Sequence, residues 1–360
     1  MTLTLIVVLG ALIGAASWYK FWKGHAAKFE QSGYVPPSSS IFGKLGMTAF
    51  AYLLTFLTVG KVKVIGRRNV PRKGRVIFAA NHQLPCDFAM VRRGSGRHFR
   101  MLTAADQLKG FFGMLSAAGG VISVAFKEKT DGQKAQDACV RVMADDGAEK
   151  DSSLRKVWSL GVLVFTGLCA VHVAGLISLT ALSVLGVVVL ALTILGTPTG
   201  SPTLGIFPQG ALLPDDQDFV EHFRPGAVKI AVEAAHQSGE HVEIVPMAIL
   251  YKWEKPSRLS FLDRKLKGMR SMFLGTRNPK AWNPLFKKSL EGLSAAEVEA
   301  IEAERKEIMR AHKKSNVTNY GGVVVVGKPV STADLPADPI AAIAIVRARI
   351  LELYAEAKRH

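Results

Sequence analysis

The sequence predicts an α/β domain joined to membrane-associated segments. The run Val76–Ala80 is continuously apolar, as expected of a strand that is buried on both faces of a sheet. Phe88–Val91 follows closely and can begin a helix. Two long stretches without charged side chains, residues 1–19 and 157–195, are typical of segments that enter a bilayer. A chain of 360 residues is long enough to hold both a substantial core and these segments.

The composition narrows the class of protein. Apolar residues make up 49% of the chain, and 46 Lys and Arg against 29 Asp and Glu give a net charge of +17. So much apolar surface excludes a disordered chain. The three cysteines, Cys86, Cys139 and Cys169, are odd in number and lack CxxC spacing, which excludes a disulfide-stapled secreted module. A basic chain binds nucleic acid or an anionic membrane, and only the membrane explains the apolar content; no nucleic-acid-binding module is recognisable.

Residues 1–19 predict an N-terminal membrane anchor. At about 1.5 Å per helical residue this stretch is close to the length of a span. It ends in a collar of aromatic and basic side chains from Trp18 to Lys23, which is typical of a membrane interface. No Lys or Arg precedes the apolar run and no clear cleavage site follows it, which argues against a cleaved signal peptide. The positive charge then places the residues after Lys20 in the cytoplasm.

The second uncharged stretch, residues 157–195, is about twice the length of one span. We therefore expect an inserted transmembrane or re-entrant hairpin that turns near His172, with one long tilted helix as the alternative. His172 itself is interpreted as a polar turn residue, and a functional group within the membrane is the other interpretation. A shorter apolar run within residues 44–60 predicts an interfacial amphipathic helix or a helix docked on the core.

The positive charge is concentrated in two regions. Residues 17–100 hold 15 basic and two acidic side chains, and residues 252–288 hold 11 basic and two acidic ones with aromatic residues between them. Both patterns favour contact with anionic lipid. Residues 252–320 as a whole are expected to form a basic, aromatic and helical insertion. Within it, Ser294 to Lys314 predicts a charged helix with Ser294 as its cap.

Asn81 and His82 follow the predicted buried strand, and Asp87 stands five residues after His82 at the start of the next helix. Imidazole is the natural general base near neutral pH, and a carboxylate can fix its tautomer and stabilise its cation. The spacing alone is a weak signal, because chance matches are common.

Several blocks around this pair resemble one known family in the order in which that family carries them. The blocks are VKVIGRRNVPRKGRVIFAANHQLPCD (62–87), GGVISV (119–124), GIFPQG (205–210), HFRPGA (222–227), IVPMA (244–248) and GGVVVVGKP (321–329). Together they resemble the glycerolipid acyltransferases, the PlsC-like 1-acylglycerol-3-phosphate acyltransferases and their relatives. The resemblance implies an α/β domain with a mixed central sheet flanked by helices. The domain would be split into residues 61–150 and 201–360 by the inserted hairpin.

The resemblance also implies a reaction and its site. His82 would deprotonate a hydroxyl of a lipid acceptor, and Asp87 would hold His82. The acyl donor would be a thioester of coenzyme A or of acyl carrier protein, without a metal or other cofactor. Cys86 is interpreted as a packing residue rather than a nucleophile. The substrate-binding residues implied by the matching blocks are Phe207, Pro208, Gln209, Gly210, Lys127, Arg224, Gly226 and Pro246.

Three departures from the family pattern concern the acceptor. The usual arginine of the second block is Phe126, the usual glutamate of the third is Gln209, and the usual threonine–arginine pair is Ala211–Leu212. The two arginines are thought to bind the acceptor's phosphate, which neither Phe nor Leu can do. Either another base (Lys127, Lys129 or Arg224) replaces them, or the acceptor is a hydroxyl lipid without phosphate there, such as a lyso-lipid or a glycosylated isoprenoid.

The order of the segments along the chain implies on which side of the membrane the site lies. His82 and Pro208 must share one site, so residues 157–195 must cross the membrane an even number of times or not at all. The expected protein is therefore integral to the cytoplasmic membrane with its site facing the cytoplasm. Its partners would be membrane lipids and the acyl donor. The alternative function is that of a catalytically impaired relative that binds lipids or organises the membrane.

Overall fold

The computed structural model describes most of the chain outside a few segments. The described residues are 19–36, 41–84, 86–125, 128, 130–145, 202–210, 223–254, 285, 290, 294–315 and 318–360. The predicted anchor, except Tyr19, and the predicted hairpin lie outside these residues, as do Lys127 and most of residues 252–293. Within the described residues, no helix combines the length and the apolar character that a membrane crossing requires.

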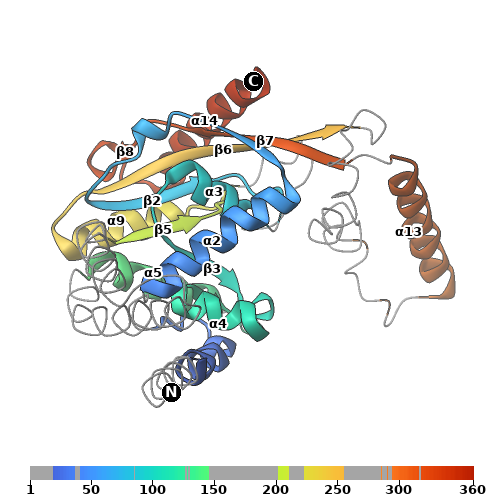
Figure 1. Ribbon diagram of the computed structural model, residues 1–360, viewed down its shortest axis with the longest axis horizontal. Helices are drawn as coiled ribbons and strands as arrows, with labels where there is room; N and C mark the ends of the chain where they lie inside the picture. Colours follow the sequence, from blue (N-terminus) through green and yellow to red (C-terminus); the bar gives the residue numbers. More distant parts are fainter. Residues whose placement is uncertain are drawn as a thin grey trace, which may run out of the picture.

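The described strands form one mixed sheet of eight strands (Figure 1). The strands are β1 (Lys61–Ile65), β2 (Arg75–Ala80), β3 (Arg100–Ala104), β4 (Ile122–Val124), β5 (Thr203–Ile206), β6 (Val242–Glu254), β7 (Thr318–Val326) and β8 (Val330–Ser331). Their order is β1-β7-β6-β2-β5-β3-β4, with β8 also on β6. The strands from β6 to β4 are mutually parallel, whereas β7 and β8 run antiparallel to β6. The predicted mixed central sheet is confirmed.

Helices cover both faces of this sheet. They are α2 (Ile41–Thr58), α3 (Asp87–Ser95), α4 (Gly110–Gly119), α5 (Asp131–Ala144), α9 (Gly226–Ser238) and α14 (Pro339–Lys358). Side chains of a strand alternate between faces, and β2 shows this directly. Val76 and Phe78 lie in the core shared with α2, α3 and α4, whereas Ile77 and Ala79 lie in the core shared with α5, α9 and α14. β2 is buried throughout, as its apolar run predicts.

The segment predicted as residues 44–60 is the helix α2, which docks on α3 and α4. Met47, Ala51 and Leu54 bury one side of it in the core, while its other side stays exposed. Residues 19–36 join the same core through Trp22 and Phe29. The folded unit therefore begins upstream of the predicted boundary at residue 61.

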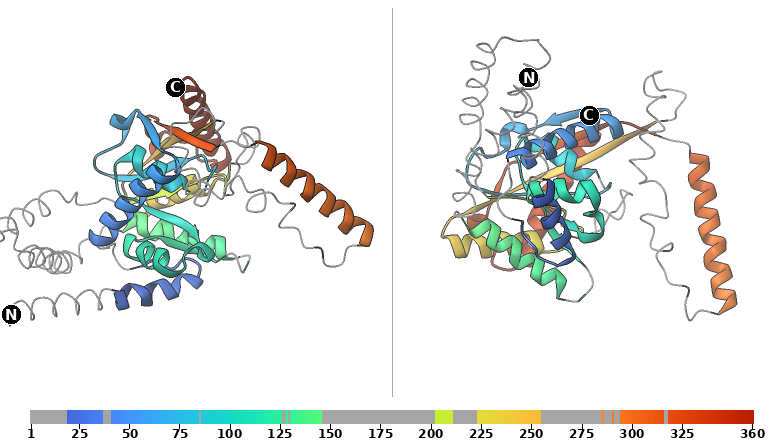
Figure 2. Two further views of the ribbon diagram at one scale, coloured as in Figure 1. Left: turned by 45° about the vertical axis from the view of Figure 1, so that its right-hand side comes forward. Right: turned by 60° about the horizontal axis from the view of Figure 1, so that its bottom comes forward.

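The two strands β6 and β7 continue well past the end of β2. Their pairing runs from Met247 opposite Val326 to Glu254 opposite Thr318, and Met247 is level with the last residue of β2. The extension is a two-stranded ribbon with a register shift between Lys252 and Trp253. We call it the β6–β7 ribbon. The helix α13 (Ala295–Ser315) lies beyond its end, apart from the main body in Figure 1 and in both views of Figure 2.

The cap predicted for the charged helix is confirmed at the start of α13. The Ser294 hydroxyl accepts a hydrogen bond from the Glu297 backbone N–H at 3.4 Å, and the Glu297 carboxylate accepts one from the Ser294 N–H at 2.9 Å. This reciprocal arrangement is a capping box, which satisfies backbone donors that the first turn of a helix leaves unpaired.

Candidate active site

His82 and Asp87 meet where β2 ends and α3 begins. His82 is the second residue after β2, and Asp87 is the first residue of α3. The distance from His82 Nδ1 to Asp87 Oδ2 is 2.8 Å, so the two predicted catalytic residues form a pair. An ionised carboxylate can only accept hydrogen bonds, which makes Nδ1 the donor. In neutral His82 the lone pair is then on Nε2, the atom that a general base needs.

Asp87 is fully buried, and both of its oxygens are hydrogen bonded. The backbone N–H groups of Gln83 and Leu84 donate to Oδ2, the latter at 2.8 Å. The hydroxyl of Tyr251 donates to Oδ1. A buried carboxylate requires such donors, because leaving it unpaired is costly. The turn between His82 and Asp87 therefore folds around the carboxylate.

Asn81 fixes the direction in which the chain leaves β2. Its side-chain amide donates to the carbonyl of Ile249 at 2.9 Å, and its side-chain carbonyl accepts from the Ile249 N–H at 2.7 Å. These two bonds replace the backbone ladder to β6 at the point where β2 stops. His82 can therefore turn out of the sheet while the neighbouring strand continues.

The turn after β5 lies against His82. β5 pairs with β2, so the two carboxyl ends are adjacent. The Phe207 ring is stacked on the His82 imidazole, with centroids 4.2 Å apart and planes 11° apart. The side-chain carbonyl of Gln209 accepts a hydrogen bond from the His82 backbone N–H. The buried Gln209 Nε2 has no hydrogen-bond partner in the described part of the chain. Both residues thus directly contact the proposed base.

Arg224 lies over the same turn. Gly210, at φ +67°, ends the turn, and its N–H donates to the Phe207 carbonyl at 3.0 Å. A Cβ built on Gly210 would be 3.2 Å from Arg224 Nε, so the guanidinium group occupies this space. The Arg224 backbone N–H also donates to the Pro208 carbonyl at 2.8 Å. The structure therefore brings one basic side chain to the turn that holds Gln209.

Two further predicted site residues, Gly226 and Pro246, lie in regular secondary structure. Gly226 is the first residue of α9, two positions after Arg224. Pro246 lies within β6 opposite Ala79, and its carbonyl accepts from the Gly327 N–H at 2.9 Å. Pro246 thus has a place in the sheet itself. Lys127 lies outside the described residues.

Cys86 is a buried residue beside the pair. Burial, with the nearby Asp87 charge, raises the pKa of its thiol to about 12. The thiolate is the nucleophilic form of cysteine, and this pKa keeps Cys86 protonated at neutral pH. Its Sγ is 3.5 Å from the Tyr251 hydroxyl oxygen. Cys86 is thus placed as a packing residue.

Tyr251 is a site residue that sequence reasoning missed. It lies in the β6–β7 ribbon, 164 positions from Asp87 in the chain. No local spacing connects the two residues, so the single sequence carries no signal that could have found this contact.

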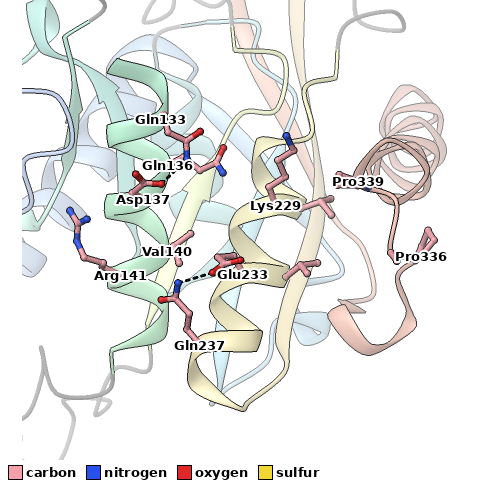
Figure 3. A pocket seen from close by; sticks show the side chains of 13 residues that line it. Gln133, Gln136, Asp137, Val140, Arg141, Lys229, Glu233, Gln237, Pro336 and Pro339 are labelled. Carbon is pink, nitrogen blue, oxygen red and sulfur yellow. Dashed lines mark hydrogen bonds between the residues drawn. The ribbon is translucent and has the colours of Figure 1, made fainter. Parts of the chain in front are cut away.

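A separate hollow of about 590 Å³ lies between α5, α9 and the start of α14 (Figure 3). Both polar and apolar side chains line it, and several of the polar ones pair within their own helix. Gln133 donates to Asp137 at 2.7 Å, and Gln237 donates to Glu233 at 2.8 Å. None of the residues that line it belongs to the site around His82.

In the comparison with protein families, the segment that contains His82 and Asp87 has a match. Residues 61–166 match the Acyltransferase family. The match covers β1 to α5 and includes both His82 and Asp87. The resemblance predicted from the sequence blocks is confirmed in this segment. No curated protein matches the chain.

One similar solved structure is the crystal structure of the 1-acyl-sn-glycerophosphate (LPA) acyltransferase, PlsC, from Thermotoga maritima. It shares 13% sequence identity with this chain, and the alignment covers 98% of this chain and 97% of that one, with a TM-score of 0.39.

Proposed function

We propose that this chain is a membrane-bound O-acyltransferase that moves a fatty acyl group from a thioester to a hydroxyl of a lipid. The observation that carries the proposal is the contact between His82 Nδ1 and the buried Asp87, which leaves Nε2 as a base beside the Phe207–Gly210 turn. The Acyltransferase match over residues 61–166 supports the same reaction class. The donor is acyl-CoA or acyl carrier protein.

In the proposed reaction the acceptor hydroxyl gives its proton to His82 Nε2 as its oxygen attacks the thioester carbonyl. The new C–O bond forms, and the tetrahedral intermediate collapses with cleavage of the C–S bond. The leaving thiolate takes the proton back from the imidazolium. Asp87 stabilises the imidazolium between these steps, as a carboxylate does in related histidine dyads and triads. The thioester is already activated, so the proposal includes no resident metal or cofactor.

Two acceptor classes fit the residues around the turn. Phe126 and Leu212 stand where the family usually carries phosphate-binding arginines. Arg224 provides one guanidinium group at the turn, which suits a lysophosphatidate-like acceptor if it replaces them. A lyso-lipid or glycosylated isoprenoid without that phosphate suits the apolar replacements. The charge-neutral Gln209 in place of glutamate is compatible with both.

The exposed surface of α2 supports the membrane proposal. Tyr52, Leu53 and Phe56 are 40–57% exposed on this helix, and the Arg93 guanidinium lies 4.4 Å from the Tyr52 ring centre. Tyr19 and Phe21 are likewise exposed before α2. Aromatic side chains with neighbouring arginine or lysine are typical of membrane-interface segments. We propose that the protein is integral to the cytoplasmic membrane and that its site faces the cytoplasm, where acyl thioesters are present.

The test is an acyl-transfer assay with the purified full chain in mixed micelles. Labelled acyl-CoA and labelled acyl carrier protein are each offered with lysophosphatidate, other lyso-lipids, glycosylated isoprenoids and total lipid of the source organism. We expect transfer to at least one acceptor, and a loss of about 10²- to 10⁴-fold in His82→Ala. No transfer above the His82→Ala level with any acceptor would overturn the enzyme proposal in favour of a lipid-binding relative.

A further inference from the structure

Tyr251 occupies a position that the proposed reaction does not itself explain. It is 5% exposed, and it reaches the site from the β6–β7 ribbon rather than from the blocks that carry His82 and the turn. Its hydroxyl donates to Asp87 Oδ1. Asp87 can only accept, so the hydroxyl proton belongs to this bond. The Cys86 thiol, 3.5 Å away, is then the donor to the tyrosine oxygen.

The hydrogen bonds of Asp87 divide unequally between its two oxygens. Oδ2 accepts from His82 Nδ1 and from the backbone N–H groups of Gln83 and Leu84. Within the described part of the chain, the Tyr251 hydroxyl is the one donor to Oδ1. The torsion that turns a carboxylate plane is soft, so a donor on the second oxygen fixes the plane. It also withdraws negative charge from the carboxylate that faces His82.

We infer that Tyr251 is a positioning residue that completes a His82–Asp87–Tyr251 triad, an inference that rests on the proposed acyl transfer. The hydroxyl holds the carboxylate plane in line with His82 Nδ1 and limits how strongly Asp87 stabilises the imidazolium. Burial, and then the charge of Asp87, raise the pKa of Tyr251 well above its usual value, so the hydroxyl remains a donor throughout the working pH range.

Contacts at two residues of β6, Ile249 and Tyr251, hold this hydroxyl in position. Ile249, two residues earlier in β6, is bound by both atoms of the Asn81 side-chain amide. Tyr251 itself pairs with Gly322 of β7. The strand is therefore bound to Asn81, just past the end of β2, two residues before Tyr251, and it is paired with β7 at Tyr251 itself.

The test compares Tyr251→Phe, which keeps the ring and removes the hydroxyl, with Cys86→Ala. The control removes the thiol that touches the same hydroxyl and leaves every hydrogen bond of Asp87 in place. We expect Tyr251→Phe to lower kcat about 10- to 100-fold, the usual effect of losing a hydrogen bond to a charged group. KM stays near the wild-type value. The acidic limb of the kcat/KM profile moves to higher pH, because an unshielded carboxylate stabilises the imidazolium more strongly. Cys86→Ala keeps the wild-type kcat and profile.

A double-mutant cycle separates positioning from general packing. In an Asp87→Asn background, removal of the Tyr251 hydroxyl is expected to cause little further loss of kcat. An equal loss in both backgrounds, or an unchanged profile in Tyr251→Phe, would overturn the inference.

A second measurement keeps this inference separate from the proposed function. The imidazole signal of His82, assigned by its absence in His82→Ala, is titrated by NMR in wild type and in Tyr251→Phe. Its midpoint is expected at higher pH in the variant, whether or not an acceptor has been found. Equal midpoints contradict the role of Tyr251, whereas a shifted midpoint in a chain that transfers no acyl group contradicts only the proposed function.

Discussion

Three donors converge on one oxygen of Asp87, and two of them are backbone N–H groups of the residues that follow His82. The carboxylate therefore organises the turn as well as the imidazole. The contact needs little more than the local chain. His82 and Asp87 are five residues apart, and a strand end followed by a helix start is enough to bring them together.

Other contacts of the site could not be predicted in the same way. The contact of Gln209 with the His82 backbone crosses 127 positions, and that of Tyr251 with Asp87 crosses 164. The family block marks Gln209 as a substrate-binding residue, but it does not predict the contact with His82. The second depends on how far β6 extends beyond β2, which no single-sequence pattern encodes.

Two buried thiols should make the protein lose stability at alkaline pH. Burial raises the pKa of Cys86 and Cys139 from 9.0 to about 12. Between these values the unfolded chain releases thiol protons that the native chain keeps, so the free energy of unfolding falls as pH rises above 9. Urea unfolding midpoints at pH 8 and pH 10.5 measure this fall. The Cys139→Ala variant should show a smaller fall than wild type. An equal fall would contradict a contribution of the Cys139 thiol to the loss of stability.

Among the elements, α2 shows most clearly what a pattern can and cannot predict. Its existence and approximate limits were predicted from the apolar run, and the structure places it at Ile41–Thr58. The run alone left interfacial and docked helices as alternatives. The structure combines both features, because Met47 and Leu54 are buried while Leu53 and Phe56 are exposed. Neighbouring apolar residues on a helix point to different sides.

We expect the exposed side of α2 to contact lipid. Nitroxide labels at Leu53→Cys and, as a matched control, at Val232→Cys on α9 are compared in the full chain with Cys169→Ser, reconstituted in anionic vesicles. Val232 is also an exposed apolar residue, at 42%, but it lies in the helical layer on the other face of the sheet. The label at 53 should be relaxed mainly by lipid-soluble oxygen, and the label at 232 by a water-soluble nickel complex. Equal accessibility of the two labels would contradict the proposed contact.

The strands illustrate a second limit of the sequence. Val76–Ala80 is predicted as a strand from its apolar run, and β2 includes it. The fourth block, residues 244–248, marked only part of β6, which spans Val242–Glu254. The strand order also places β7 between β1 and β6, a pairing between distant segments that depends on the whole sheet.

At the scale of the whole molecule, the segment between β6 and β7, residues 255–317, is a long excursion from the sheet. Glu254 and Thr318 are paired at the end of the β6–β7 ribbon, so β6 ends beside the residue at which β7 begins. Within that excursion, Arg305 donates to the Leu285 carbonyl at 2.8 Å and Ser294 caps α13. These contacts are internal to the excursion, which predicts that it can be removed as a unit.

We expect a variant in which Asn-Gly joins Glu254 directly to Thr318 to fold and to retain the site. A two-residue Asn-Gly turn closes an antiparallel ribbon without splaying its strands. In mixed micelles its kcat should stay within about threefold of wild type if the ribbon alone positions Tyr251, while its residence on anionic vesicles should fall because the basic residues 255–288 are gone. Loss of folding, or a fall in kcat as large as that of Tyr251→Phe, would show that the excursion supports the site.

The register shift in the ribbon has a consequence for how the protein can change over time. A slip of one residue turns every following side chain to the opposite face of a strand, and at Tyr251 this would remove the hydroxyl from Asp87. The shift lies between Lys252 and Trp253, one residue beyond Tyr251, with Tyr320 as the extra residue on β7. A bulge accommodates such an extra residue locally. An insertion or deletion beyond the bulge can therefore be absorbed there, and the register that holds Tyr251 against Asp87 stays unchanged.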